Sequence, residues 1–126
     1  ETEMYYNLSY CYFIKEDFNK AKEFFGRCLQ VAPYHLKAID YVCDILRKEG
    51  KHNEAFNITL QAIQKHPGYA AGWNNLAGYE ILQKRYITAH LFVTQALTLA
   101  PNYSDALHNL KIIEEKNPQL KRFNKR

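Results

Sequence analysis

Residues 70–101 read AAGWNNLAGYEILQKRYITAHLFVTQALTLAP, and this stretch decides the fold. Its apolar side chains recur at helical spacing in two segments, at Trp73, Leu76 and Ala77 and then at Ala89, Ala96 and Leu97. Such spacing places apolar residues on one face of a helix. The polar break Lys84-Arg85 separates the segments, and Pro101 ends the second one because proline cannot continue a helix. The stretch therefore predicts a pair of α-helices.

The same pattern recurs along the chain with a period of about 34 residues, a length typical of repeat architectures. The step from Pro33 to Pro67 is repeated from Pro67 to Pro101. Other columns keep the same step, and they include Ala21, Ala55 and Ala89; Cys28, Ala62 and Ala96; Leu29, Ile63 and Leu97; and Leu8, Val42, Leu76 and Leu110. We expect helices near 3–15, 18–31, 36–49, 52–65, 70–83, 86–99 and 104–116.

Small residues in two of the columns indicate how each helix pair packs. Two antiparallel helices that approach closely need small side chains where their backbones cross. One such column holds Ala21, Ala55 and Ala89, the opposing one holds Ser9, Cys43 and Ala77, and larger side chains four positions earlier fill the adjoining space, at Tyr5, Ile39, Trp73 and Leu107. Cys28 and Cys43 are thus interpreted as small apolar fillers rather than reactive thiols.

These columns resemble the tetratricopeptide repeat family, whose pattern is W-x2-L-G-x2-Y, then A-x3-F, then P, in each repeat. The resemblance implies an all-α fold, a right-handed α-solenoid of antiparallel helix pairs. We expect three repeat units at 1–35, 36–69 and 70–103, a capping helix at 104–117 and a basic tail at 118–126. Three residues depart from the pattern and are expected to alter local packing, namely Glu80, Thr59 and Val93.

Composition and charge exclude several classes of protein. The chain has 126 residues with 17 Lys and Arg against 13 Asp and Glu, and it has no apolar run long enough to span a membrane. Residues 1–115 carry a formal charge of −1, since 12 cations face 13 acids, so a nucleic-acid groove is not expected. Three cysteines without CxxC spacing favour a reducing, intracellular (cytoplasmic) setting over a disulfide framework or zinc site.

No catalytic, cofactor or metal motif is present, so we do not expect an enzyme. HExxH, GxxxxGK[ST], GxGxxG and GxSxG are all missing, and the five histidines are scattered. Asp40 and Asp44 lie one helical turn apart, which suits paired carboxylates. The alternative, favoured by nearby Lys37, Arg47 and Lys48, is a salt-bridged helix face.

The first helix of each unit is expected to line a concave groove, because solenoids of helix pairs present it there. The candidate groove residues are Tyr6, Asn7, Tyr10, Phe13, Lys37, Asp40, Tyr41, Asp44, Asn74, Asn75, Gly78, Asp105, His108 and Asn109. An amide both donates and accepts, so Asn7, Asn75 and Asn109 form a ladder suited to gripping the backbone of an extended peptide. The alternative is that asparagines bond across neighbouring repeats.

An aromatic strip and a bare helix position complete the predicted groove. Tyr6, Tyr10, Phe13 and Tyr41 offer rigid contact surface, unless part of the strip packs under a preceding helix. Gly78 either leaves room for a ligand or is a tolerated mid-helix glycine.

The predicted function is protein–protein interaction, as a scaffold or adaptor that holds a protein or peptide partner in the groove. The family resemblance includes chaperone-tail binders, but Tyr6 and Ala71 lie where those proteins carry cations, so that specificity is not expected. A second hypothesis is self-association or complex assembly through an uncapped N-terminal end, with further repeats or a partner before Glu1. A third is contact of the basic tail, Lys121–Arg126, with nucleic acid or anionic lipid.

Overall fold

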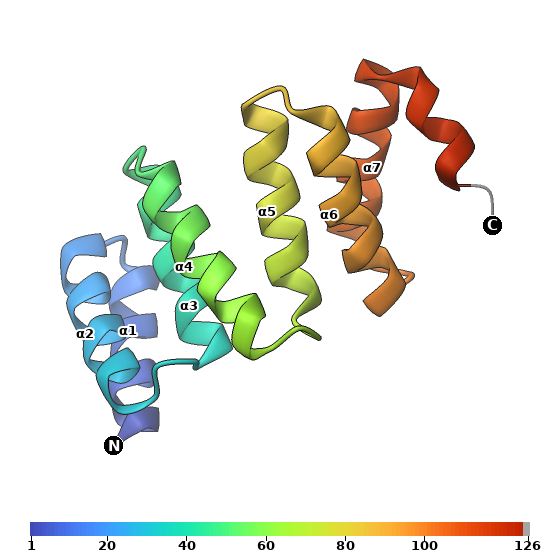
Figure 1. Ribbon diagram of the computed structural model, residues 1–126. Coiled ribbons are helices and arrows are strands. Elements are labelled where there is room, and N and C mark those ends of the chain that lie inside the picture. The colour runs from blue at the N-terminus through green and yellow to red at the C-terminus, as the bar shows by residue number, and fades with distance from the viewer. Residues whose placement is uncertain (125–126) are drawn as a thin grey trace. The chain divides into compact units, whose positions relative to one another are not determined.

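The computed structural model describes residues 1–124 and shows an all-α protein (Figure 1). The helices are α1 (Thr2–Ile14), α2 (Phe18–Val31), α3 (Leu36–Lys48), α4 (His52–Lys65), α5 (Ala70–Leu82), α6 (Tyr86–Leu99) and α7 (Ser104–Lys116), followed by the 3-10 helix η1 (Pro118–Asn124). All seven α-helices begin and end within one residue of the predicted positions. The predicted all-α fold of antiparallel helix pairs is confirmed.

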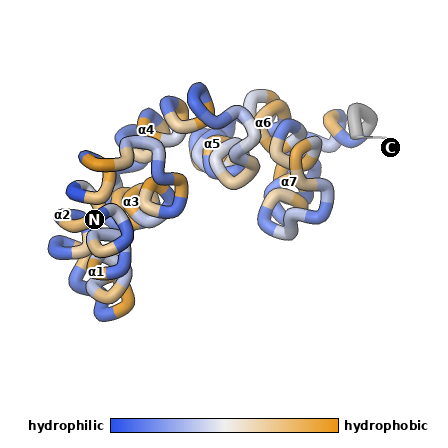
Figure 2. Tube along the Cα trace, turned by 90° about the horizontal axis from the view of Figure 1, so that it is seen from below, coloured by the Kyte–Doolittle hydropathy of each residue, from blue (hydrophilic) through white to orange (hydrophobic). Residues whose placement is uncertain are grey.

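The chain divides into two compact units, the first Glu1–Lys65 and the second beginning at His66. In the first unit α1 packs on α2, and α3 packs on both α2 and α4. In the second, α5 packs on α6, α7 packs on both, and η1 packs on α7. Hydrophilic and hydrophobic residues alternate along the helices, as the colouring of Figure 2 shows. This alternation is what helices covered on one side require.

The small-residue columns lie where the helices of each pair meet. Ala21, Ala89 and Ala77 are fully buried, and Ala55 and Cys43 are nearly so. Cys28 and Cys43 are buried and unbridged, which agrees with their interpretation as fillers. Of the larger side chains four positions before the small column, Ile39 is buried, whereas Leu107 is 43% exposed.

The turn between the two helices of each pair has a residue in the left-handed backbone conformation at the same position in all three repeats. Glu16, Gly50 and Lys84 have φ values of 62°, 79° and 60°, and each lies one repeat period after the one before. The following N–H donates to a carbonyl five residues back, at 2.8–3.0 Å, which is the Schellman bond that closes a helix. A left-handed residue is therefore built into the repeat.

Pro118 occupies the fourth position of this column, one repeat period after Lys84. Its ring fixes φ at a negative value, so the left-handed turn cannot form there. The chain continues as the short helix η1 instead of a second long helix.

Part of the predicted basic tail, 118–126, packs on the second unit. Residues 118–124 are helical, and Leu120 is 7% exposed in the core of the second unit. The reason is that this apolar side chain can be buried beside α7, whereas Lys121 next to it stays exposed. Lys125, Arg126 and the side chain of Arg122 lie outside the described part.

Candidate functional site

Four of the predicted groove residues form an aromatic cluster in the first unit, where α1 meets α3. Tyr41 is at its centre, with ring centroids 4.8 Å from Phe13, 5.6 Å from Tyr10 and 6.2 Å from Tyr6. Below it, the buried ring of Phe25 stacks on Tyr41 at 5.3 Å with an interplanar angle of 7°. We call Tyr6, Tyr10, Phe13 and Tyr41 the α1–α3 aromatic cluster. The sequence prediction that these four side chains form one strip is therefore consistent with their geometry.

The cluster is only partly covered. Tyr10 is 40% exposed, and Tyr6, Phe13 and Tyr41 are half-buried. Lys48 Nζ lies 5.2 Å from the ring centroid of Phe13, within cation–π range. His35, at the start of α3, stacks on Tyr6 at 5.0 Å. The surface thus combines rigid aromatic area with a cation at one edge.

Two acidic residues of α3 border the cluster, and they differ because Asp44 forms ion pairs whereas Asp40 is shielded from solvent by burial. Asp44 is paired, with Lys48 at 3.3 Å and Arg47 at 4.0 Å. This pairing agrees with the salt-bridged face rather than with two carboxylates poised for acid–base chemistry.

Burial raises the pKa of Asp40 to about 6, and Arg47 opposes this rise. Burial also raises the pKa of Tyr6, and its hydrogen bond with Tyr41 adds to the increase.

In the second unit the corresponding face, between α5 and α7, carries amides. The side-chain N–H of Asn109 donates to the side-chain oxygen of Asn74 at 2.9 Å, and Asn74 is 6% exposed. Two of the candidate residues therefore satisfy each other across adjacent first helices. Asn75 is half-buried beside them, and Asp105 and His108 are exposed.

The predicted asparagine ladder is divided between the units. Asn7 is exposed on α1 in the first unit, and Lys37 is exposed on α3. Asn75 and Asn109 are on α5 and α7 in the second, where Asn109 is engaged by Asn74. A Cβ added at Gly78 would meet no atom within 4 Å, so open space lies over this turn of α5. Ligand contact by the ladder stays a prediction.

The three departures from the repeat pattern are all accommodated. Glu80 is 5% exposed and accepts a hydrogen bond from Arg85 Nε at 2.5 Å. Thr59 is buried and donates to the carbonyl of Ala55 at 2.8 Å. Val93 is fully buried. Sequence reasoning missed the pairing of Glu80 with Arg85, although a buried acid beside a turn cation was a readable signal.

Neither a metal site nor a membrane span is found in the part of the chain that is described. Its His, Cys, Asp and Glu residues form no group of three or more suited to hold a metal ion. None of its helices has the length and apolar character needed to cross a bilayer. Its three cysteines, Cys11, Cys28 and Cys43, are free.

Comparison with protein families and curated relatives gives two findings. The tetratricopeptide repeat model matches residues 2–35. The human protein O-mannosyl-transferase TMTC1 is 28% identical over 128 aligned residues, and the mouse protein of the same name is 27% identical. Each alignment covers 98% of this chain, which spans only 14% of the length of these relatives.

Solved structures of low sequence identity share the fold. The first tetratricopeptide repeat domain of Spaghetti (RPAP3), bound to an HSP90 peptide, has a TM-score of 0.80 at 15% identity and covers 90% of each chain. The Sgt2 domain from Aspergillus fumigatus has a TM-score of 0.81 at 15% identity, covering 96% of this chain and 82% of its own. The TPR2B domain of yeast Sti1, in complex with pHsp70, has a TM-score of 0.77 at 22% identity, covering 94% and 97%.

Proposed function

We propose that this chain, whose residues 2–35 match the tetratricopeptide repeat model and whose fold is that of tetratricopeptide repeat domains, is a protein-interaction module that binds a segment of a partner protein on the α1–α3 aromatic cluster. The observation that carries the proposal is the grouping of four aromatic rings around Tyr41 with Tyr10 40% exposed. Tyrosine rings supply large contact area at low entropic cost, and they are frequent anchors of interfaces. Of the structural relatives, one is bound to an HSP90 peptide and another is in a complex with pHsp70.

The partner segment is expected to be rich in apolar and aromatic side chains and not to be a carboxylate-terminated chaperone tail. Tyr6 and Ala71 stand where the chaperone-tail binders carry cations. Beside the aromatic cluster, burial raises the pKa of Asp40. A cationic side chain on the partner would lower the pKa of Asp40 and gain affinity from its charge. Because the face is small, modest affinity is expected from this unit alone.

We also propose that the segment contributes binding rather than catalysis, and that it works in a reducing, intracellular setting. The transferase named for the curated relatives is much longer than this chain, since the match spans 14% of it. The free state of Cys11, Cys28 and Cys43 supports the proposed compartment.

Affinity capture from the native cell extract followed by mass spectrometry tests the binding face. Tyr10→Ala removes an exposed ring that packs at the edge of Tyr41, so the fold should survive. Tyr34→Ala is the matched control, because Tyr34 is 41% exposed and lies in the turn before α3. We expect the partner to be recovered with wild type and Tyr34→Ala and lost with Tyr10→Ala. Equal recovery by all three proteins would rule out the aromatic face.

A second function, assembly through the N-terminal end, has its own support in α1. Met4 is 58% exposed, Leu8 is 37% exposed and Cys11 is also exposed, at positions i, i+4 and i+7 of one helix. Such a stripe suits contact with another helix. Sedimentation velocity on a dilution series should show oligomers that dissociate, and Met4→Lys with Leu8→Lys should abolish them. A monomer at all concentrations would exclude this function.

The tail hypothesis is kept in a narrower form. Since Leu120 belongs to the core, the deletion that tests it removes residues 121–126 only. Unchanged retention on a heparin column would end the hypothesis, whereas a loss that depends on salt would support it.

A further inference from the structure

The outer face of α6 carries two exposed apolar residues that the earlier repeats lack. Ile87 and Leu91 are each 65% exposed and lie one helical turn apart. At the same positions one repeat period earlier the chain has Asn53 and Asn57, and one period before those it has Asn19 and Glu23. The period does not require apolar residues there, so the pair on α6 calls for a separate explanation.

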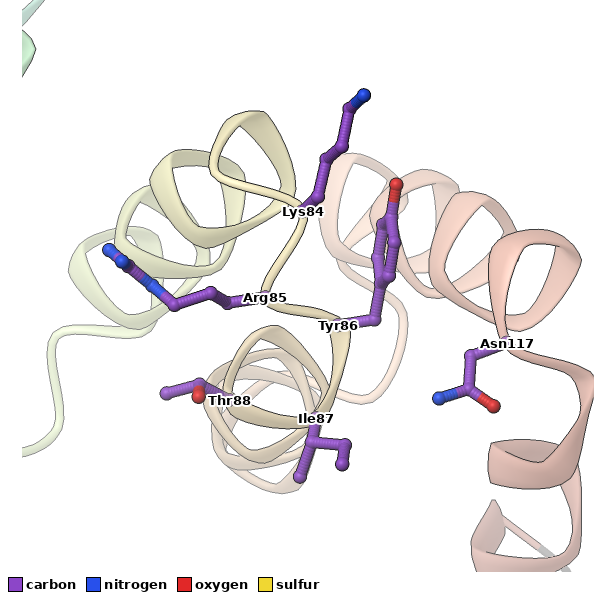
Figure 3. Close-up of a pocket in the computed structure, with 6 residues that line it drawn as sticks. All are labelled: Lys84, Arg85, Tyr86, Ile87, Thr88 and Asn117. Carbon is purple, nitrogen blue, oxygen red and sulfur yellow. The ribbon is translucent and has the colours of Figure 1, made fainter.

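Two adjoining pockets follow this face. One, of about 530 Å³, is lined by Ile87, His90, Leu91, Thr94, Gln95 and Leu120. The other, of about 340 Å³, is lined by Lys84, Arg85, Tyr86, Ile87, Thr88 and Asn117. Figure 3 shows Asn117, at the end of α7, pointing toward the first turn of α6, where Tyr86 and Ile87 project. Because Ile87 lines both pockets, they form one groove beside η1.

The register of the repeat explains why a short helix borders the groove. A second helix of a fourth repeat would start near Leu120, but Pro118 prevents the left-handed turn that precedes such a helix. The short helix η1 takes its place and contributes Leu120 to the groove. Ile87 and Leu91 line the groove beside this short element.

The polar groups of the groove indicate the charge of its occupant. Its lining includes the cations Lys84 and Arg85 and no Asp or Glu, and α6 itself contains no acidic residue. Arg85 is paired with Glu80, which leaves Lys84 as the nearest cation with no ion pair among the described residues. The hydroxyl of Thr94 is buried in the lining without a hydrogen-bond partner among those residues.

We propose that the groove between α6 and η1 docks one acidic amphipathic helix of a partner protein. Apolar side chains three or four residues apart on that helix seat against Ile87, Leu91 and Leu120, which is the helix-in-groove mode of recognition. Its acidic side chains face Lys84. This site lies in the second unit and is separate from the α1–α3 aromatic cluster.

A displayed library of helix-forming peptides of about 16 residues tests the proposal, since isolated helices shorter than about 12–15 residues are marginal in water. The library varies Leu, Ala, Glu, Lys and Gln and is selected on the full chain, and the affinity of each enriched peptide is then measured on the double variant Ile87→Asn, Leu91→Asn. That variant introduces the residues of the second repeat, Asn53 and Asn57, at two exposed positions, so it should fold. Circular dichroism checks this.

The expected result is enrichment of acidic peptides with apolar residues three or four apart. Their affinity should fall about ten-fold or more in the double variant, as for loss of an interface anchor. It should weaken in Lys84→Glu and stay unchanged in Tyr10→Ala. Bound peptide should slow hydrogen exchange in α6 and η1.

Three results would overturn the proposal. The first is the absence of enrichment, and the second is selection of basic peptides or of peptides that bind wild type and double variant equally. The third is a wild-type dimer that the double variant abolishes, because the groove would then join two copies of this chain.

Discussion

The first helices of the two units present different surfaces on the same fold. Tyr41 in α3 and Asn75 in α5 are one repeat period apart, yet the first is the centre of an aromatic cluster and the second lies beside an amide pair. Asp40 and Asn74 differ in the same way at the preceding position. The small residues where helices cross maintain the fold, and the neighbouring columns are free to take the chemistry of a ligand. Function is therefore to be sought in the columns where the units differ.

The largest expected difference between the units is in the buried column of Phe25, Thr59 and Val93. Phe25→Ala should lower the free energy of unfolding by about 3–5 kcal/mol, because a large ring leaves a cavity under Tyr41. Val93→Ala should cost about 2 kcal/mol, since only two methyl groups are lost. Urea denaturation measures both. Equal losses would show that the aromatic cluster does not depend on Phe25.

The second largest expected difference between the units is a pH dependence of stability that arises from Asp40 in the first unit. The pKa of Asp40 is about 6 in the fold, against an ordinary value of 3.8, because burial disfavours the carboxylate. The folded state therefore binds this proton more tightly, and the stabilisation present below the ordinary pKa is lost as the pH rises through 6. The loss should be on the order of 2 kcal/mol after allowance for solvent screening.

Thermal unfolding across this window, compared with Asp40→Asn, measures the effect. The stability of Asp40→Asn should lack the pH dependence that Asp40 causes in wild type, and this variant should be more stable than wild type at neutral pH. Parallel stability profiles for the two proteins would contradict the shift. Because the other titratable groups are common to both proteins, only the difference between the profiles is used.

The amide pair allows the corresponding test in the second unit. Asn109→Ala should cost about 1–3 kcal/mol, because it leaves the buried oxygen of Asn74 without its donor. The double variant with Asn74→Ala should cost less than the sum of the two single changes. Chemical denaturation of the four proteins gives the coupling. Strict additivity would mean that the bond contributes nothing and that Asn109 is free to serve a ligand.

The sequence predicts the helices well because their signals are local and repeated. The periodic columns and the prolines that end second helices place every predicted α-helix within one residue of its observed bounds. Bonding of asparagines across neighbouring repeats was the stated alternative to the ladder, but its partners Asn74 and Asn109 could not be read from the sequence, because they depend on which of two adjacent amides turns toward the next helix. The aromatic cluster was predictable because its four rings recur at groove positions.

Two other features were present in the register but did not enter the prediction. Pro118 falls on the column of left-handed turns, so the irregular end of the chain was in principle predictable once the φ values of that column were known. Ile87 and Leu91 replace polar residues of the earlier repeats. The columns that agree between repeats identify the fold, whereas the positions at which one repeat differs from the others indicate candidate sites.

The smallest expected effect concerns Gly78 in α5. Gly78→Ala should raise the free energy of unfolding by up to about 1 kcal/mol, because alanine favours a helix and the added Cβ meets no atom within 4 Å. Gly50→Ala is the matched control and should be destabilising, since Gly50 has φ of 79°. Partner affinity measured beside stability separates the two interpretations of Gly78. A variant that is more stable but binds less tightly indicates that the glycine leaves room for the partner, whereas unchanged affinity indicates a glycine that the helix merely tolerates.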